Sequence, residues 1–298
     1  LQEKAPSLAK LVANKAMPAA ARVASLNALA DLKADELQGA LAAIDGNAPV
    51  ALRKRAVALL SHTSPEQAVP VLGSLLDNAS LGEKQAACEA LGNLAHASAT
   101  ELLRTWMQRI SNGKVKKGVV LDILEAANKH EALKPLVTAH ETASKLLGPL
   151  GPYDMCTDGG DANAGRKVFH DFEATRCTRC HMLNNKGGNA GPVLNGIGMR
   201  LQPDKLLESL VQPSAVIAEG FGTTTVEMKG GALFAGVITK DQDGAITLVD
   251  INGKSHQLLW DKIKSRSPSK ASAMPLMGES LSKRQLRDLI AFLKKQNK

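Results

Sequence analysis

The sequence predicts a mainly α-helical chain with a small antiparallel β-sheet in its second half. Apolar residues make up 44% of the 298 residues and aromatic residues only 3%, which favours helices packed through Ala and Leu over a β-sandwich. A helical pattern recurs four times in the first half, and three short stretches of alternating apolar and polar residues lie in the second half. These observations together indicate two domains of different architecture.

The repeated pattern is a basic residue followed by small or apolar residues three, six and seven positions later. Each copy precedes a second amphipathic stretch, and one amphipathic helix pair cannot bury its apolar face alone, so we expect the pairs to stack. The basic residues are Arg22, Arg53, Lys84 and Lys117, and the second stretches are 34–44, 65–76, 99–110 and 131–143. The pattern resembles HEAT repeats with a shortened period, which implies an α-solenoid over residues 1–146. An irregular helical bundle is the alternative.

Residues 147–160 interrupt this periodicity with four Gly and two Pro. Such a cluster is typical of a connection between folded segments. We therefore expect a linker over 147–160 and a second domain over 161–298.

The most specific motif is Cys177-Thr178-Arg179-Cys180-His181, whose C-x-x-C-H spacing is that of a c-type haem attachment site. Cys177 and Cys180 can each form a thioether with one vinyl group of the same porphyrin, and His181 then faces the iron. The motif predicts one covalent haem c with His181 as an iron ligand.

The other two cysteines, Cys88 and Cys156, are isolated in the sequence, whereas a structural zinc site would need a second closely spaced pair of ligands. We expect neither of them to bind a metal. Cys88 falls on the buried side of a repeat helix, where a free Cys acts as a small apolar side chain. Cys156 lies in the expected linker, and a disulfide between the two is left open.

Two segments around the motif resemble small cytochromes c of class I. Residues 161–169 resemble their first helix, with Asp161 as the N-cap. The loop at 186–194 contains Gly191-Pro192-Val193-Leu194, which resembles their Gly-Pro-x-Leu element. That resemblance implies that the Pro192 carbonyl accepts a hydrogen bond from the His181 imidazole and so orients the ring.

The same resemblance implies a Met on a Met-Pro loop before the last helix as the sixth iron ligand. Met274-Pro275 lies on such a loop, ahead of a helix indicated by Leu286, Leu289, Ile290 and Leu293. We expect Met274 to be the distal ligand, with Met277 as the second choice. His170, His256 and Met199 come after these two. A thioether in this position closes the iron to exogenous ligands and raises its reduction potential.

Between the loop at 186–194 and Met274, three stretches alternate between apolar and polar residues, and turn signals that contain Gly separate them. These stretches are 224–228, 233–237 and 246–249. They predict an antiparallel insert of three or four strands at about 222–260. With it, residues 158–298 resemble the cytochrome c-type haem-binding domain found in Planctomycetes and Verrucomicrobia. The shared segments are Gly159-Gly160-Asp161, 165–169, 177–181, 191–194, Pro213-Ser214-Ala215, 250–253, 272–275 and 287–292. In that family the domain often follows HEAT-like repeats and a β-propeller that resembles quinone-dependent sugar dehydrogenases.

These features predict electron transfer through one haem c with His and Met axial ligands. The resemblance implies a dehydrogenase as donor, a cytochrome or oxidase as acceptor, and a chain that is the electron-relay end of a larger protein, with no enzyme activity expected of this chain alone. The alternative is a haem-based sensor of small ligands or a peroxidase-like enzyme. Covalent haem attachment in bacteria takes place outside the cytoplasm, so we expect a periplasmic or exported protein.

The net charge of +8 is spread over both halves of the chain and is not gathered in one basic arm, so we expect no nucleic-acid partner. The sequence has no apolar run of the length that crosses a bilayer, so we expect no membrane span.

Overall fold

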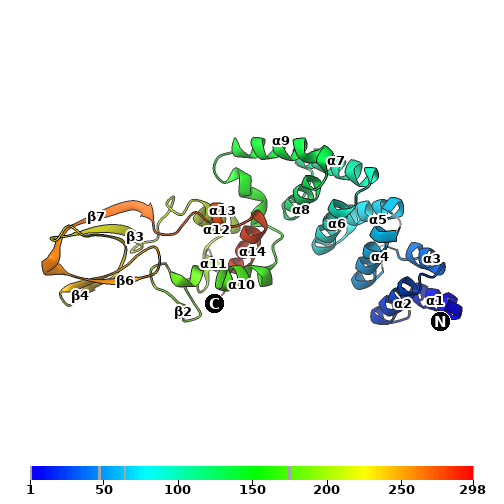
Figure 1. The fold of residues 1–298 in the computed structure, drawn as a ribbon, viewed down its shortest axis with the longest axis horizontal. Helices are drawn as coiled ribbons and strands as arrows, with labels where there is room; N and C mark the ends of the chain where they lie inside the picture. Colours follow the sequence, from blue (N-terminus) through cyan, green and yellow to red (C-terminus); the bar gives the residue numbers. More distant parts are fainter. Residues whose placement is uncertain (1, 46–47, 64, 174–175, 298) are drawn as a thin grey trace. The chain divides into compact units, whose positions relative to one another are not determined.

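The computed structural model describes residues 2–45, 48–63, 65–173 and 176–297. The described chain is mainly helical and has a small antiparallel sheet in its second half, as the composition and periodicity predicted (Figure 1). It divides into two compact units, Leu1–Thr142 and Ala143–Lys298.

The first unit is built of α-helices that follow one another with short connections. Helices α2, α4, α6 and α8 contain the four repeated basic positions, and each of them packs against the next. The bounds are α1 Ala5–Ala13, α2 Ala19–Asp31, α3 Glu36–Ala42, α4 Val50–Thr63, α5 Pro65–Asn78, α6 Leu81–Asn93, α7 Ala97–Ser111, α8 Lys117–Asn128 and α9 Lys134–Lys145, preceded by a 3-10 turn at Gln2–Lys4 and interrupted by another at Glu131–Leu133. The helix pairs expected from the sequence are therefore present.

Basic side chains at the repeated positions connect neighbouring helices. Arg22 is buried and its Nε donates to the carbonyl of Val12, 2.7 Å away. Arg53 Nε donates to Glu83 Oε1 at 2.9 Å, so this pair joins α4 to α6. Buried polar groups need such partners, because leaving one unpaired costs about 1–3 kcal/mol.

The second unit has a helical part and a sheet. The helical elements are 3-10 helix η3 Gly151–Thr157, α10 Ala162–Asp171, 3-10 turn η4 Cys177–Arg179, α11 Ile197–Arg200, α12 Pro203–Val211, 3-10 turn η5 Trp260–Lys262, α13 Met277–Ser280 and α14 Lys283–Lys294. Asp161 caps α10 by accepting the Asn163 N–H at 2.8 Å, which confirms the predicted N-cap. Ser282 and Gln285 form a capping box at the start of α14.

Helices α10 and α14 cross closely because a glycine stands at their contact. A Cβ on Gly165 would lie 1.9 Å from the carbonyl oxygen of Asp288, so any side chain there would force the helices apart. Phe169 is 1% exposed and packs against Phe292 with ring centroids 5.4 Å apart. This crossing forms the core next to the C-x-x-C-H segment, which follows α10.

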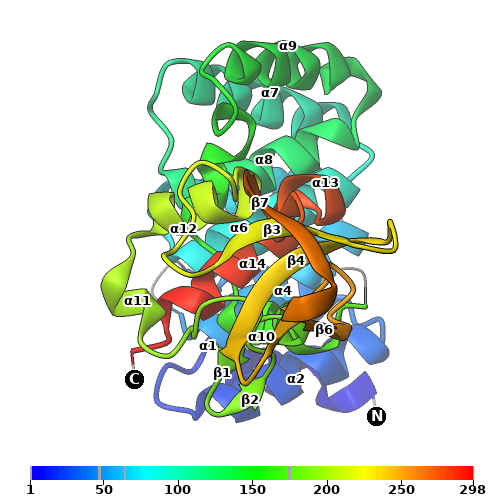
Figure 2. The ribbon, with the colours of Figure 1, turned by 90° about the vertical axis from the view of Figure 1, so that its left-hand side faces the viewer.

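Residues 222–272, all of them described, form a five-stranded antiparallel sheet, which faces the viewer from one end in Figure 2. The strands are β3 Gly222–Met228, β4 Leu233–Gln242, β5 Ala245–Val249, β6 Ser255–Leu259 and β7 Ile263–Ser272, in the order β6-β5-β4-β3-β7. A two-stranded hairpin, β1 Met182–Leu183 and β2 Lys186–Gly187, lies apart from it.

The large sheet is longer than the stretch 222–260 expected for it. Strand β7 continues to Ser272 and pairs with β3. Its residues do not alternate between apolar and polar, because most of the strand is exposed on both faces. Pro268 is tolerated because β7 is an edge strand. Helix α12 ends at Val211, because the residue before Pro213 is disfavoured in the helical conformation.

The segment expected as a linker is folded over half its length. Residues 151–157 form η3, which packs against α12 and α14. Met155 and Cys156 are buried there, and the Tyr153 hydroxyl donates to the carbonyl of Gly278 at 3.1 Å. None of the described helices is both long and apolar enough to cross a bilayer.

Candidate haem attachment site

The C-x-x-C-H residues form a single tight turn after α10. Cys177–Arg179 is a 3-10 helix, and the N–H of His181 donates to the Cys177 carbonyl at 2.9 Å. Side chains three residues apart in a 3-10 turn lie one above the other. The turn therefore gives Cys177 and Cys180 the same direction, as two thioethers to one flat ring require.

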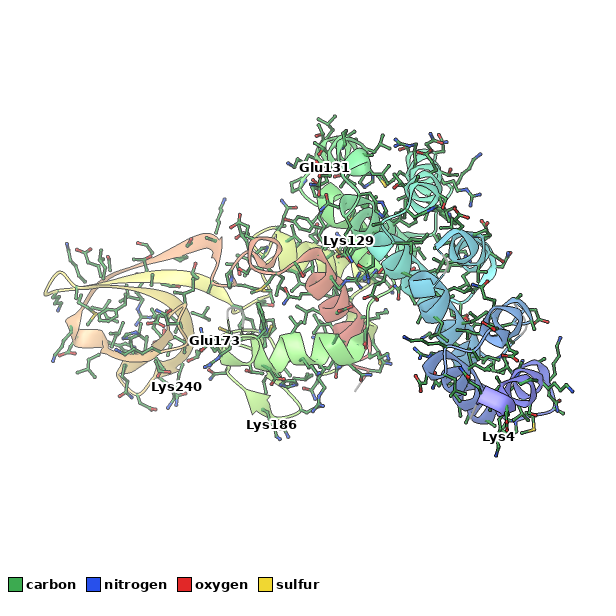
Figure 3. The ribbon with its side chains drawn as sticks, turned by 45° about the vertical axis from the view of Figure 1, so that its right-hand side comes forward. Lys4, Lys129, Glu131, Glu173, Lys186 and Lys240 are labelled. Carbon is green, nitrogen blue, oxygen red and sulfur yellow. The ribbon has the colours of Figure 1, made fainter. Side chains whose placement is uncertain are left out.

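The segment after the turn folds back over it. Asn184 and Asn185 have positive φ of 52° and 60°, the combination of a type I′ hairpin turn, for which Asn is favoured. This turn joins β1 to β2. Lys186, the first residue of β2, is labelled in Figure 3. The Asn-Asn pair is the sequence signal for this hairpin, and only Lys186 and Gly187 of it fall in the loop expected at 186–194.

The loop after β2 supplies hydrogen bonds to the turn's carbonyls. The N–H of Gly188 donates to Thr178 at 2.9 Å, and the N–H of Gly191 donates to Cys180 at 2.8 Å. A Cβ on Gly188 would lie 1.9 Å from the Arg179 carbonyl oxygen, so this close approach requires glycine. The loop and the cysteine turn are thus held together by backbone hydrogen bonds.

The His181 ring is held on one edge and on one face. Its Nδ1 lies 2.9 Å from the carbonyl oxygen of Pro192, which is the contact that the Gly-Pro-x-Leu resemblance implies. A carbonyl only accepts, so Nδ1 carries the proton and donates. Gly191 lies against the ring, since a Cβ there would be 2.7 Å from Cε1.

This arrangement leaves Nε2 of His181 as the free ring nitrogen, without a hydrogen-bond partner among the described residues. Burial lowers the pKa of His181, and the hydrogen bond to Pro192 offsets only part of that shift. The imidazole is therefore neutral at physiological pH, with a lone pair on Nε2. A neutral imidazole whose other nitrogen donates to a carbonyl is the form that binds metals.

Cys180 lies against an apolar cluster to which the sheet contributes. The cluster consists of Ala190, Val237 and Val249, all buried, and Cys180, Phe221 and Ala273 pack against it. Burial raises the pKa of the Cys180 thiol, and the positive charge of Arg179 opposes this only partly. The thiol is therefore protonated at neutral pH.

Met274 lies on the irregular segment between β7 and α13, as expected. Its N–H donates to Ser272 Oγ at 3.1 Å, and its neighbour Ala273 packs against the same cluster as Cys180. Met277 is different, because its side chain is 3% exposed in the helical core. The structure thus brings the Met274 segment and the cysteine turn to one cluster.

The three lower-ranked candidates for a sixth ligand have other surroundings. Met199 is 72% exposed. His256 Nε2 is 2.8 Å from Asp250 Oδ2, and the His170 ring packs edge-on against Phe169 with centroids 5.0 Å apart.

All four cysteines lie in the described part of the chain, and none of them is in a disulfide there. Cys88 is fully buried in α6, on the buried side of the helix as expected. Cys156 is also buried, and its Sγ donates to the Lys283 carbonyl at 3.3 Å.

The residues present fit a c-type haem. The two thiols share a turn, and the neutral imidazole is oriented with Nε2 free. Within the described residues, no three His, Cys, Asp or Glu side chains gather as a metal-binding cluster. A haem iron takes four ligands from its porphyrin and needs only axial ligands from the chain.

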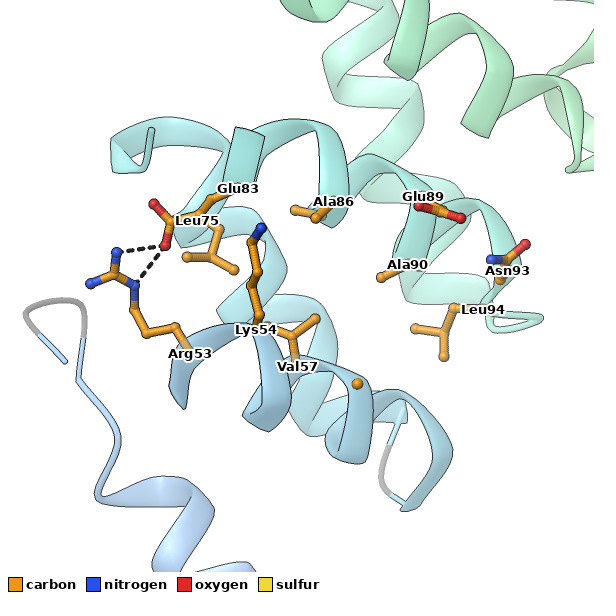
Figure 4. A pocket seen from close by; sticks show the side chains of 12 residues that line it. Arg53, Lys54, Val57, Leu75, Glu83, Ala86, Glu89, Ala90, Asn93 and Leu94 are labelled. Carbon is orange, nitrogen blue, oxygen red and sulfur yellow. Dashed lines mark hydrogen bonds and ion pairs between the residues drawn. The ribbon is translucent and has the colours of Figure 1, made fainter. Parts of the chain in front are cut away.

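A hollow of about 340 Å³ lies in the first unit, among α4, α5 and α6 (Figure 4). Small side chains such as Ala86 and Ala90 line it, together with the charged side chains of Lys54 and Glu89. The Arg53–Glu83 ion pair closes one end. Nothing in this lining selects a particular ligand.

A scan against protein-family models and a search of the curated proteins each found no match to this chain.

Proposed function

We propose that this chain transfers electrons through one covalent haem c, attached at Cys177 and Cys180, with His181 and Met274 as axial ligands. The observation that carries the proposal is the state of His181: a neutral ring, oriented by Pro192 and Gly191, whose Nε2 is free beside two thiols on one turn. When bound, the haem supplies a one-electron couple between ferric and ferrous iron.

The protein residues have distinct tasks in this proposal. Pro192 fixes the tautomer and increases the basicity of the His181 ring. Met274 supplies a thioether that leaves no iron position open to oxygen or peroxide. Met277 is unsuited to this task, because it would have to leave the core in which it is buried.

The alternative function is a sensor or peroxidase-like enzyme with an open iron position. A peroxidase-like site needs a polar group that takes and returns protons on the distal side. The cluster between Cys180 and Ala273 is apolar instead, and His256 is engaged by Asp250. These observations favour electron transfer.

The wider context follows the resemblance. The second unit would be a class I-like cytochrome c domain with a β insert. The first would be a HEAT-like solenoid that spaces or docks a redox partner. A dehydrogenase domain or protein is the proposed donor and a cytochrome or oxidase the acceptor, in the periplasm or outside the cell.

Absorption spectra of the oxidised and reduced protein test the proposal. Full-length chain made in cells that attach haem c should keep its haem through acid–acetone extraction. The oxidised form should show the Met-to-iron charge-transfer band, and the reduced form should not bind carbon monoxide. Haem that is extracted would rule out the covalent site, and carbon monoxide binding would favour the sensor or enzyme.

A further inference from the structure

The inserted sheet has two buried faces with different partners. Val226, Ile246, Leu248 and Leu258 form the sheet's own core on one face. On the other face, Val237 of β4 and Val249 of β5 are paired across the strands and pack with Ala190 of the loop that follows the cysteine turn. The second face is therefore directed at the attachment segment.

Three parts of the proposed haem site meet at that second face. Cys180 belongs to the attachment turn, and Ala190 belongs to the loop that orients His181. Ala273 is the residue directly before Met274. A thioether bonds the Cys180 sulfur to a former vinyl carbon, which is attached directly to the porphyrin edge. Whatever packs around Cys180 therefore packs around that edge.

A hairpin of the same sheet reaches the attachment turn independently. Between β5 and β6, a Cβ on Gly253 would lie 3.6 Å from Cβ of Arg179. Asp250 holds this hairpin by accepting the N–H groups of Asn252 and Lys254 at 2.9 and 3.0 Å and by its contact with His256. Hydrogen bonds therefore hold the hairpin together next to the place where it meets the turn.

We propose that the inserted sheet is a wall of the haem pocket, in which Val237 and Val249 exclude water from the porphyrin edge at Cys180 and thereby raise the haem's reduction potential. This inference rests on the proposed function and extends it to residues outside the attachment motif. The ferric haem carries one positive charge more than the ferrous haem, and apolar surroundings disfavour the added charge. The wall therefore favours the reduced form.

The sheet offers a matched control for this proposal. Val226 of β3 and Val237 of β4 are both valines in the interior of the sheet, 0% and 1% exposed. Val237 pairs with Thr223, three residues from Val226, so the two side chains lie on opposite faces. Val226→Thr and Val237→Thr both add a hydroxyl to a buried site of the sheet, but only Val237→Thr adds it to the wall.

The experiment measures the reduction potential and the thermal midpoint of haem-loaded full chain for wild type, Val237→Thr and Val226→Thr. Both variants should lose thermal stability, because each buries a hydroxyl. Only Val237→Thr should lower the potential, by a several-fold shift of the ferric–ferrous equilibrium. Equal reduction potentials in all three proteins, or equal shifts in both variants, would contradict the proposal that the sheet is a wall of the haem pocket.

The pair Val237→Ala and Val226→Ala, which adds no hydroxyl, decides the question if a Thr variant does not fold. Loss of haem from the Val237 variants alone supports the wall, and equal loss from both pairs contradicts it. The covalent haem content of the wild-type chain is measured first. Wild-type chain without covalent haem refutes the proposed function and the wall together, whereas haem-loaded wild type with no effect specific to Val237 refutes the wall alone.

Discussion

Gly191 lies flat against the imidazole of His181, so closely that a Cβ at position 191 would be 2.7 Å from Cε1 and 2.8 Å from Nδ1 of the ring. The same ring donates from Nδ1 to the carbonyl of Pro192, the next residue in the chain. Two consecutive residues therefore fix the ring's plane and its tautomer. Any side chain at position 191 must therefore displace either the imidazole ring or the Pro192 carbonyl that accepts its hydrogen bond.

We expect Gly191→Ala to move the imidazole and weaken its hydrogen bond to Pro192. Overpacking of this kind costs about 1–3 kcal/mol. The proposed iron site should then show a lower reduction potential and a weaker Met-to-iron band, measured by redox titration and absorption. The control is Gly230→Ala, since a Cβ at 230 meets nothing within 4 Å and its φ is not positive. If both variants keep the wild-type spectrum, the close approach has no role in the site.

The sequence predicted those elements whose signals are local. The α10 N-cap at Asp161 and the final helix begun by Ser282 depend on residues within one turn of each other, so pattern and capping chemistry were sufficient. The helices of the first unit were predicted because their period repeats. Strand β7 was not, since an exposed edge strand of Ser, Lys and Pro carries no alternation.

The tertiary contacts of the candidate site were beyond local reasoning. The cluster that joins Cys180 to Val237, Val249 and Ala273 brings together residues up to 93 positions apart, and nothing in their local sequence marks them. The His181–Pro192 contact was expected only through resemblance to small cytochromes c. The burial of Met277, which separates it from Met274, depends on how α13 packs, and the sequence left both residues as candidates.

Replacing both Cys177 and Cys180 by Ala should abolish covalent attachment, because each sulfur is expected to form one thioether. The double variant should release all of its haem on acid–acetone extraction, read as absorbance in the soluble fraction. Cys88→Ala is the control, since Cys88 is buried in α6 and should not affect attachment. Full retention of haem by the double variant would end the haem c interpretation.

Met274→Ala should open the iron to carbon monoxide or cyanide and lower the reduction potential, because a thioether ligand is lost. Met277→Ala should leave the iron closed. It should still destabilise the second unit by about 2–5 kcal/mol, since a buried side chain is removed from the core. Ligand-binding spectra and thermal melts of both variants separate these effects. The reverse pattern would make Met277 the ligand, and two closed sites would direct attention to His170, His256 and Met199.

The last prediction concerns the first unit, in which Arg53 and Glu83 form an ion pair between α4 and α6 with Nη2 and Oε1 2.5 Å apart (Figure 4). The Glu83 side chain is 3% exposed and also accepts from the hydroxyl of Ser80 at 2.7 Å. Burial opposes ionisation of Glu83, but the hydrogen bonds from Ser80 and Arg53 outweigh it, so the pKa of its carboxyl is lowered.

A carboxyl whose pKa is lowered by folding contributes stability above its unfolded pKa, near 4.3 for Glu, and loses that contribution as the pH falls through its folded value. Glu83→Gln should therefore destabilise the first unit at pH 7, by about 3 kcal/mol because the Arg53 guanidinium loses its carboxylate partner, and should converge with wild type as the pH falls below about 4. Urea unfolding followed by circular dichroism at several pH values measures the difference.

Asp77→Asn is the matched control, since its pair with Arg109 also joins two helices of the first unit but is exposed. This substitution should cost less than about 1 kcal/mol. A Glu83→Gln deficit that stays constant from pH 7 to pH 3 would show that the lost stability comes from packing and not from charge.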